Sequence, residues 1–122
     1  MADHNKLGKK GEEIALKYLK SNQYIIKETN WRFRKNEVDI IAEKDNLLVV
    51  VEVKTRTSEY FENPKEAVTR KKQRFIILSA DAYVQEKNIE WEVRFDIIAV
   101  TIINQQINIE HIQDAFQPSL LL

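Results

Sequence analysis

The sequence predicts an α/β domain in which helices pack on a mixed sheet. Apolar residues recur at helical spacing from about Lys6 to Ser21, whereas the runs Val38 to Ala42 and Leu47 to Lys54 are rich in β-branched residues. Only two glycines and two prolines interrupt the chain, which favours long regular elements joined by short turns. A chain of 122 residues is expected to form one domain that spans residues 1–122.

The first helix carries two neighbouring glutamates in different surroundings. At about 100° per residue, Glu12 lies at the edge of the apolar stripe, beside Ala15 and Leu19, whereas Glu13 points toward solvent. The two carboxylates are therefore not equivalent, and Glu12 is the one near the packed side of the helix.

Three strands are expected after this helix. The first begins at Tyr24 and ends in the basic and aromatic stretch of residues 30–35. The two β-branched runs then form a hairpin with a two-residue turn at Asp45-Asn46, because Asp and Asn tolerate the left-handed backbone of tight turns. In that hairpin Lys44 pairs with Leu47, which fixes the register of both strands.

A second helix is predicted from Asn63 to about Glu86. Its start combines an N-cap asparagine, a proline at the first helical position and a glutamate at the capping-box position, in the sequence Asn63-Pro64-Lys65-Glu66. The apolar residues expected to be buried by this helix are Val68, Phe75 and Leu78.

The last third of the chain is expected to add two strands. They span residues 93–103 and 106–112, the second being short, and complete the element order αβββαββ. An acid in an apolar strand needs a partner, and for Asp96 one candidate is Arg94 on the same strand face. A structural ion pair is the preferred interpretation, and a remote contribution to the site is the alternative. The apolar tail, with Phe116 and Leu120 to Leu122, is a candidate contact surface for a homodimer.

Composition excludes several classes of protein. Hydrophobic residues make up 43% and charged residues 31%, which is too apolar for a disordered chain. Without cysteine there is no disulfide, no cysteine-based metal site and no thiol nucleophile, so a cytoplasmic protein is expected. No apolar stretch is long enough for a signal peptide or a membrane span, so no membrane partner is expected.

Charge is balanced over the whole chain but not locally. Nineteen Lys and Arg residues oppose nineteen Asp and Glu residues, which argues against tight binding to plain duplex DNA. Residues 65–74 nevertheless carry a net charge of +4, and residues 97–122 contain no Lys or Arg. A nucleic-acid partner is therefore not excluded.

Charged residues follow the most apolar strand. Leu47 to Val51 has the pattern of a strand buried on both faces, and Glu52 comes directly after it. The predicted hairpin register places Asp39 opposite Glu52 and Glu37 opposite Lys54, all on one face of the sheet. Opposed carboxylates lie about 5 Å apart at Cβ and repel each other, and a divalent cation would relieve that repulsion.

Two interpretations of this cluster are compatible with the spacing. Magnesium usually binds through one or two carboxylates plus substrate phosphates. Asp39 and Glu52 would then hold Mg²⁺ or Mn²⁺, while Lys54 positions an attacking water or stabilises charge on a phosphate. Alternatively, the same residues form a ladder of ion pairs on a half-exposed face. The spacing alone does not decide between these interpretations.

Several motifs, in order, resemble those of a known family. Glu37-Val38-Asp39-Ile40-Ile41 followed by Val51-Glu52-Val53-Lys54-Thr55-Arg56 resembles the active-site signature of the PD-(D/E)XK nuclease superfamily, whose core is an αβββαβ unit. Gly11-Glu12-Glu13-Ile14-Ala15, Asn30-Trp31-Arg32 and Arg94-Phe95-Asp96-Ile97 are similar to motifs of the YraN-like family of small bacterial proteins. That family is grouped with Holliday-junction resolvase-type endonucleases.

The resemblance implies a restriction-endonuclease-like fold and assigns roles to four residues. Asp39 and Glu52 match the metal ligands, and Lys54 matches the catalytic lysine. Glu12 matches a carboxylate that related resolvases supply from the first helix, and it would complete the metal shell directly or through water. Val38 replaces the proline of the superfamily's name, which removes no proposed ligand.

The function implied is a Mg²⁺- or Mn²⁺-dependent endonuclease acting on DNA, with branched or junction DNA as one candidate substrate. The alternative is a non-catalytic nucleic-acid-binding or assembly protein that keeps the nuclease fold. Seven cations are candidates for contacts with nucleic acid, although a solvated helix face explains those of the second helix about as well. They are Arg32, Arg34, Lys35, Arg56, Arg70, Lys71 and Arg74.

A third and weaker interpretation concerns RNA. Gly8-Lys9-Lys10-Gly11 has the form of the GXXG loop with which KH domains clamp single-stranded RNA. That loop joins two helices, whereas this segment opens the first predicted helix, so the context argues against an RNA-binding module.

Overall fold

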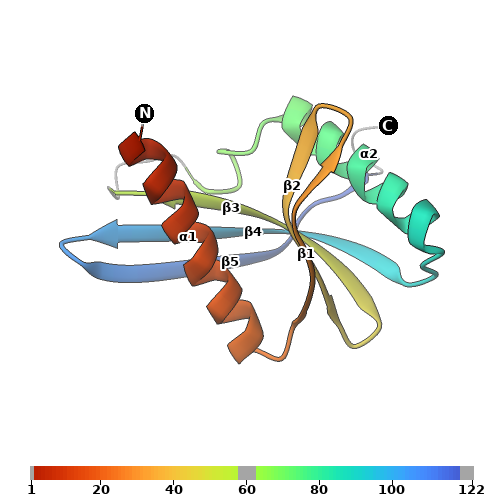
Figure 1. Ribbon diagram of the computed structural model, residues 1–122, viewed down its shortest axis with the longest axis horizontal. Coiled ribbons are helices and arrows are strands. Elements are labelled where there is room, and N and C mark those ends of the chain that lie inside the picture. Colours follow the sequence, from red (N-terminus) through yellow and green to blue (C-terminus); the bar gives the residue numbers. More distant parts are fainter. Residues whose placement is uncertain (1, 58–62, 119–122) are drawn as a thin grey trace.

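The sheet has five strands in the order β1-β2-β3-β4-β5, and all neighbouring strands except β3 and β4 run antiparallel (Figure 1). The computed structural model describes residues 2–57 and 63–118. The elements are α1 (Ala2–Ser21), β1 (Ile25–Phe33), β2 (Asn36–Lys44), β3 (Leu47–Arg56), α2 (Arg70–Lys87), β4 (Glu92–Ile103) and β5 (Gln106–Phe116). This architecture confirms the predicted α/β class and is consistent with a restriction-endonuclease-like core.

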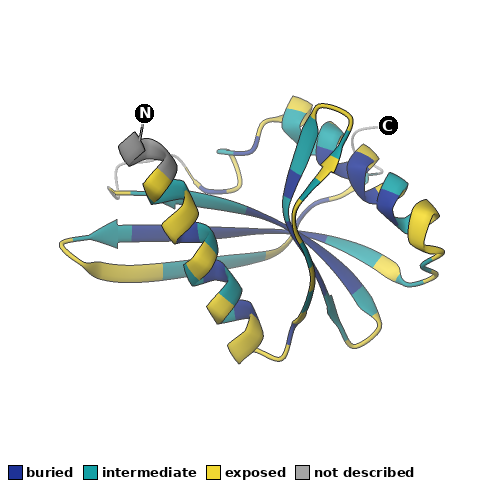
Figure 2. Cartoon of the chain, viewed as in Figure 1, coloured by how far each residue is buried: buried dark blue, intermediate teal, exposed yellow. Residues whose placement is uncertain are grey.

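The core lies on both faces of β3. Leu48 and Val50 pack into a cluster with α2, whereas Val49 and Val51 face the opposite side and pack with α1. All four side chains are at most 1% exposed, as predicted for a strand buried on both faces (Figure 2). Each contributes about 1.5 to 3 kcal/mol by leaving water, so β3 is the axis against which both helices are positioned.

The predicted hairpin between β2 and β3 forms in the predicted register. Asp45 and Asn46 have φ angles of 52° and 61°, as expected for residues of a tight turn. Pairing runs from this turn to the pair Ile40 and Val51 and ends there. Beyond that pair β2 turns away from β3 and continues beside β1 (Figure 1). The expected backbone pairs farther along, Asp39 with Glu52 and Glu37 with Lys54, therefore do not form.

A bend in β1 and β2 explains this separation. Asn30, in the middle of β1, has a φ of 51°, which is uncommon inside a strand. It lies between the pair Thr29 and Ile40 and the pair Trp31 and Val38, so the strands bend at the level of Asp39. The β1–β2 hairpin thereby leaves the sheet and packs over α2.

The second helix begins six residues later than predicted, at Arg70 instead of Pro64. Residues 64–67 form only a turn, in which the Asn63 side chain accepts a hydrogen bond from the amide two residues later at 3.0 Å. The helix proper starts at Arg70, because Thr69 Oγ1 accepts a hydrogen bond from the backbone N–H of Lys72 at 3.2 Å and caps it.

The later start of α2 changes which residues are buried. Val68 is buried as predicted, but in the bend before the helix. Leu78 is 53% exposed, so its predicted burial is wrong, because the packed face of the helix consists of Ile76, Ile77, Ser79, Ala80 and Tyr83.

The last strand is longer than expected. β5 spans eleven residues and ends at Phe116, whose ring stacks on Phe95 of β4 with centroids 5.2 Å apart. The predicted tail surface at Leu120 to Leu122 lies outside the described residues. None of the helices in the described ranges has the length and apolar composition needed to cross a membrane.

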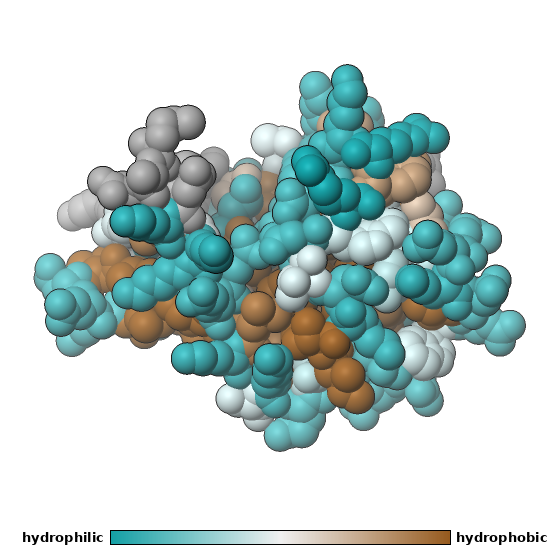
Figure 3. Space-filling model, viewed as in Figure 1, coloured by the Kyte–Doolittle hydropathy of each residue, from teal (hydrophilic) through white to brown (hydrophobic). Residues whose placement is uncertain are grey.

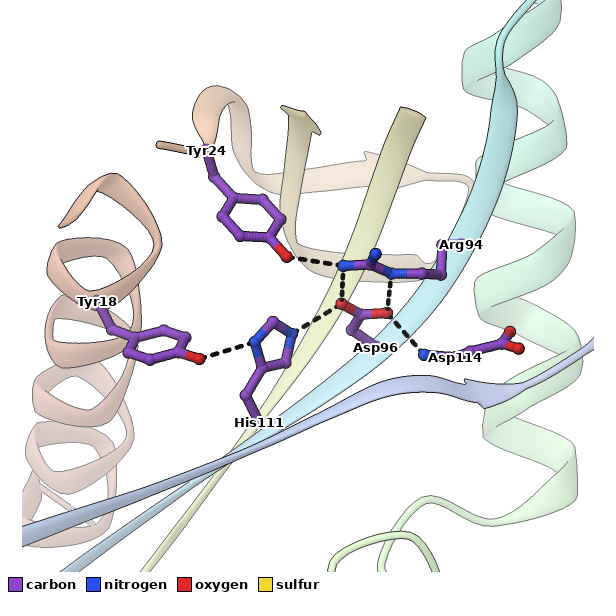
Figure 4. Close-up of polar contacts among 6 residues, drawn as sticks. All are labelled: Tyr18, Tyr24, Arg94, Asp96, His111 and Asp114. Carbon is purple, nitrogen blue, oxygen red and sulfur yellow. Dashed lines mark hydrogen bonds and ion pairs between the residues drawn. The ribbon is translucent and has the colours of Figure 1, made fainter. Parts of the chain in front are cut away.

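A buried acid ties α1 to the last two strands. Asp96 on β4 is fully buried and accepts two hydrogen bonds from the Arg94 side chain, at 2.9 and 2.8 Å (Figure 4). This confirms the predicted structural ion pair. His111 Nε2 lies 2.7 Å from the same carboxylate, and the Tyr18 hydroxyl on α1 lies 3.0 Å from His111 Nδ1. If Nε2 donates to Asp96, Nδ1 is free to accept from Tyr18.

A glycine sets the distance between α1 and β3. A Cβ atom at Gly11 would lie 1.8 Å from Thr55 Oγ1, so a side chain cannot fit without a shift, whereas Gly8, one turn earlier, has open space around it. The close approach brings the neighbouring Glu12 to the sheet. The segment from Gly8 to Gly11 is thus a helical turn, not the loop that a KH-type module requires.

Candidate active site

The candidate site lies where β2 separates from β3 (Figure 1). One residue past the last pair of the ladder, Asp39 Oδ2 accepts a hydrogen bond from the backbone N–H of Val53 at 2.8 Å. Glu52 precedes Val53 on β3, and the carboxyl groups of Asp39 and Glu52 each influence the pKa of the other. The two carboxylates proposed from the sequence are thus neighbours, held by a side-chain contact instead of the predicted backbone pairing.

Glu52 is an acid in an apolar environment. The residue is 4% exposed, and its Oε2 has no hydrogen-bond partner in the part of the chain that the structure describes. Burial and, next, the charge of Asp39 raise the pKa of Glu52 to about 8. Burial also raises the pKa of Asp39, although the hydrogen bond from Val53 opposes the increase. A cation placed between these acids would stabilise both in the charged form.

Two lysines face this acidic pair from different elements. Lys72 Nζ, in the first turn of α2, forms an ion pair with Glu52 Oε1 at 3.6 Å. Lys54 lies two residues after Glu52 on β3, and its positive charge lowers the pKa values of both Asp39 and Glu52. The ion pair of Glu52 therefore crosses from the sheet to a helix, instead of following the sheet as a ladder of ion pairs would.

Lys72 was not singled out from the sequence, although a signal for it exists. Ile76 lies seven residues before Tyr83, and both are buried. Lys72 lies four residues before Ile76, so helical spacing places it on the same packed face of α2. Lys71 and Arg74 are exposed on the other sides of the same turn. A lysine on the packed face of a helix indicates a nearby acid, and here that acid is Glu52.

Glu12 reaches the edge of the site from α1. Its Oε1 accepts a hydrogen bond from Asn30 Nδ2 at 2.9 Å, which ties the first helix to the bend in β1. Burial raises the pKa of Glu12, the Asn30 hydrogen bond opposes this, and the charges of Asp39 and Glu37 raise it further. Asn30 was also not assigned from the sequence, where an asparagine inside a strand is the sign of a bend.

The three carboxylates do not form a closed cage. Within residues 2–57 and 63–118, no three His, Cys, Asp or Glu side chains are grouped closely enough to hold a metal ion together. Asp39 and Glu52 are the close pair, whereas Glu12 is held at the edge of the site by its hydrogen bond with Asn30. A cation bound here would keep open positions, as Mg²⁺ sites that also bind phosphate do.

The cations proposed for nucleic-acid contact fall into three places. Arg32, Arg34 and Lys35 are exposed at the end of the β1–β2 hairpin, which projects at the top of Figure 1 and lies among hydrophilic residues in Figure 3. A second group is exposed on the first two turns of α2. It consists of Arg70, Lys71 and Arg74. Arg56 is half-buried, and its Nε donates a hydrogen bond to Thr101 Oγ1 at 2.9 Å.

Comparison with known proteins places the chain in a family. The family model described as "Uncharacterised protein family UPF0102" matches residues 11–100. The chain belongs to UPF0102. This is the YraN family, so the family resemblance found in the motifs is confirmed. The matched range of UPF0102 contains Glu12, Asp39, Glu52, Lys54 and Lys72.

Relatives within UPF0102 are similar over nearly the whole chain. The UPF0102 protein of Christiangramia forsetii is 49% identical over 116 residues, which is 95% of this chain and 98% of the relative. The UPF0102 proteins of Phocaeicola vulgatus and Bacteroides thetaiotaomicron are each 48% identical to this chain over 120 residues. In both cases the match covers 98% of this chain and 99% of the relative.

Proposed function

We propose that this protein is a divalent-cation-dependent endonuclease that hydrolyses phosphodiester bonds in DNA, including branched DNA. The observation that carries the proposal is the pair Asp39 and Glu52, with a buried Glu52 oxygen that lacks a partner among the described residues. Placing a half-buried acid beside a buried one lowers stability unless a cation compensates them. A catalytic metal site accounts for such a pair, and the motif resemblance points to the same residues.

The donor set suits a hard divalent cation. Asp39 and Glu52 would hold Mg²⁺ or Mn²⁺, which prefer carboxylate oxygens. Glu12, which accepts a hydrogen bond from Asn30, would contribute to the coordination of the cation through an intervening water. When bound, the cation would supply Lewis-acid stabilisation of the scissile phosphate and would lower the pKa of a neighbouring water.

The lysines would act on the substrate. Lys54 would orient the attacking water and stabilise the negative charge that develops on the phosphate. Lys72 would be released from Glu52 once a divalent cation compensates that carboxylate, and its charge would then face the phosphate. The exposed cations of the hairpin and of α2 would hold the DNA backbone on either side. A symmetric branched substrate would engage two copies of the chain, as in a cytoplasmic homodimer.

Cleavage assays test this proposal. Linear, flapped and branched DNA are incubated with Mg²⁺ and the wild type, Asp39→Asn, Lys54→Ala or Lys27→Ala. The last variant is the control and replaces an exposed lysine of β1 whose Nζ lies 3.6 Å from Glu43 Oε2. We expect cleavage by the wild type and Lys27→Ala, and a loss of about 100-fold or more in the two site variants. Binding by all four proteins without cleavage by any would instead support a non-catalytic nucleic-acid-binding protein.

A further inference from the structure

The β1–β2 hairpin carries an aromatic row that leads away from the candidate site. We call residues 31–38 the hairpin arm, because this part of the hairpin lies beyond the ladder with β3. On the arm, Trp31 contacts Tyr83 of α2 edge to face, with centroids 5.2 Å apart. The ring of Phe33 lies parallel to that of Trp31, with an angle of 2° between planes and 6.4 Å between centroids.

The two ends of this row have different surroundings. Trp31 packs against the hydrophobic cluster beneath α2. Phe33 belongs to neither hydrophobic cluster of the described residues, and its ring is covered by the Arg34 guanidinium, 5.0 Å from the ring centroid. The core therefore accounts for Trp31, whereas Phe33 is half-buried outside it, between Trp31 and Arg34, so an added base would stack on the Arg34 guanidinium or take its place over the ring.

The backbone at the end of the arm disfavours the side chain that it carries. Arg34 has a φ of 58°, in the left-handed region that glycine and asparagine adopt most easily. Arginine in this conformation costs about 1 kcal/mol relative to the right-handed region. The cost is consistent with a role for the guanidinium itself, which the turn holds over the face of Phe33.

The chemistry of the arm suits an unpaired base. Aromatic rings and guanidinium planes both stack on bases, and neighbouring cations neutralise the phosphates that connect them. Arg32, Arg34 and Lys35 supply three exposed cations, and residues 29–36 contain no acid. Phe33 lies opposite Asn36 in the hairpin, and Asn36 is three residues before Asp39 on β2, a span of about 10 Å along the strand. That distance is less than one helical turn of duplex DNA, which is about 34 Å.

We propose that Phe33 and Arg34 form a stacking site for an unpaired base of a nucleic acid whose duplex part lies at the carboxylate pair. The inference rests on the proposed function for the class of substrate. The hairpin arm would select substrates that have a single-stranded segment, such as a flap or a displaced strand. The arm would contact the bases of that segment as well as its phosphates.

Fluorescence anisotropy with Ca²⁺ present tests the stacking site. The probes are a continuous duplex, a duplex with a short thymine flap, and the same duplex with an abasic flap. The variants are Phe33→Leu, Phe33→Tyr and, as a matched control, Ile107→Ala, which removes an apolar side chain that is 50% exposed near the end of the β4–β5 hairpin. A 2-aminopurine in the flap reports stacking independently of affinity.

The wild type should bind the thymine flap about tenfold more tightly than the abasic flap, the difference expected for one stacked base. Phe33→Leu should lose this preference and leave 2-aminopurine unquenched, whereas Phe33→Tyr and Ile107→Ala should keep both signals. Equal behaviour of Phe33→Leu and the wild type, in a wild type that cleaves DNA, overturns the stacking site and leaves the proposed function intact. A wild type that neither binds nor cleaves any of the probes overturns both.

Discussion

The Asp39 carboxylate accepts a hydrogen bond from the backbone N–H of Val53 at 2.8 Å, one residue beyond the point where β2 and β3 stop pairing. A side chain therefore takes the place of the next backbone pair. The contact holds Asp39 beside Glu52 although the two strands have separated. The geometry of the candidate site depends on this bond as well as on the charges of the two acids.

Asp39→Asn and Asp39→Ala should separate the structural role of this bond from the chemical one. The asparagine oxygen can still accept the hydrogen bond from Val53, whereas alanine leaves that partly buried amide without its partner, at a cost of about 1 to 3 kcal/mol. Urea denaturation should thus show Asp39→Ala to be clearly less stable than Asp39→Asn. Both variants should lose cleavage. Equal stabilities would show that the bond does not hold the strands.

Gly11→Ala and Gly8→Ala should have opposite effects on stability. At Gly11 the new methyl group meets Thr55, so α1 must move away from β3, at a cost of about 1 to 3 kcal/mol. At Gly8 nothing lies within 4 Å, and alanine stabilises an exposed helix interior by about 0.5 to 1 kcal/mol. Thermal denaturation measures both.

The same pair of variants also tests the position of Glu12. Displacement of α1 should weaken cleavage by Gly11→Ala, and Gly8→Ala should cleave as the wild type does. Full activity in a destabilised Gly11→Ala protein would mean that the close approach of α1 serves stability alone.

Glu52→Gln should stabilise the metal-free protein at alkaline pH. Because burial and Asp39 raise the pKa of Glu52 from 4.5 to about 8, the protonated form favours folding, and this contribution is lost as the pH rises through about 8. Glutamine carries no charge, so the advantage of the variant should grow between about pH 5 and pH 9 and reach about 2 kcal/mol or more. The measurement is the free energy of unfolding in EDTA at each pH. Parallel stability curves for the two proteins would contradict the buried, raised-pKa acid.

Asp96→Asn should destabilise the protein strongly at neutral pH. Burial alone would raise the pKa of Asp96, but hydrogen bonds from His111 and Arg94 hold it below its ordinary value of 3.8. The charged form therefore favours folding above about pH 4, and this contribution is lost as the pH falls through the lowered pKa. Removing the charge leaves Arg94 without its buried partner, and we expect a loss of about 3 to 5 kcal/mol.

The pH dependence provides the check on Asp96. The stability gap between Asp96→Asn and the wild type, measured by urea denaturation, should shrink as the pH falls below about 4. Glu110→Gln, which changes an exposed acid on β5, should follow the wild type at every pH. A gap that does not depend on pH would mean that packing, and not charge, is what Asp96 contributes.

Local patterns in the sequence were sufficient for the elements and for the inner part of the hairpin. The turn at Asp45-Asn46 and the apolar run of β3 determine a register that the structure keeps as far as Ile40 and Val51. These features depend only on neighbouring residues and on burial, so the local sequence pattern is sufficient to predict them.

Features that depend on tertiary contacts were missed. The bend at Asn30 separates β2 from β3, and it shifts the alternation of exposed and half-buried residues along β1 by one position. Two residues before α2, Asn63 and Thr69, have side chains suited to cap a helix, and each accepts a hydrogen bond from a following backbone N–H. The helix starts after the second of them. Lys72 reaches the site through an ion pair between α2 and β3, a contact between elements far apart in the sequence.

A crystal structure of the wild-type protein with Mn²⁺, using anomalous diffraction to locate the ion, tests the central claim most directly. The account predicts an anomalous peak between the Asp39 and Glu52 carboxylates, at about 2.1 to 2.3 Å from their oxygens, with the Lys72 ammonium moved away from Glu52. A structure with Mn²⁺ bound elsewhere, or with no peak at this pair and the Lys72–Glu52 ion pair intact, would contradict it.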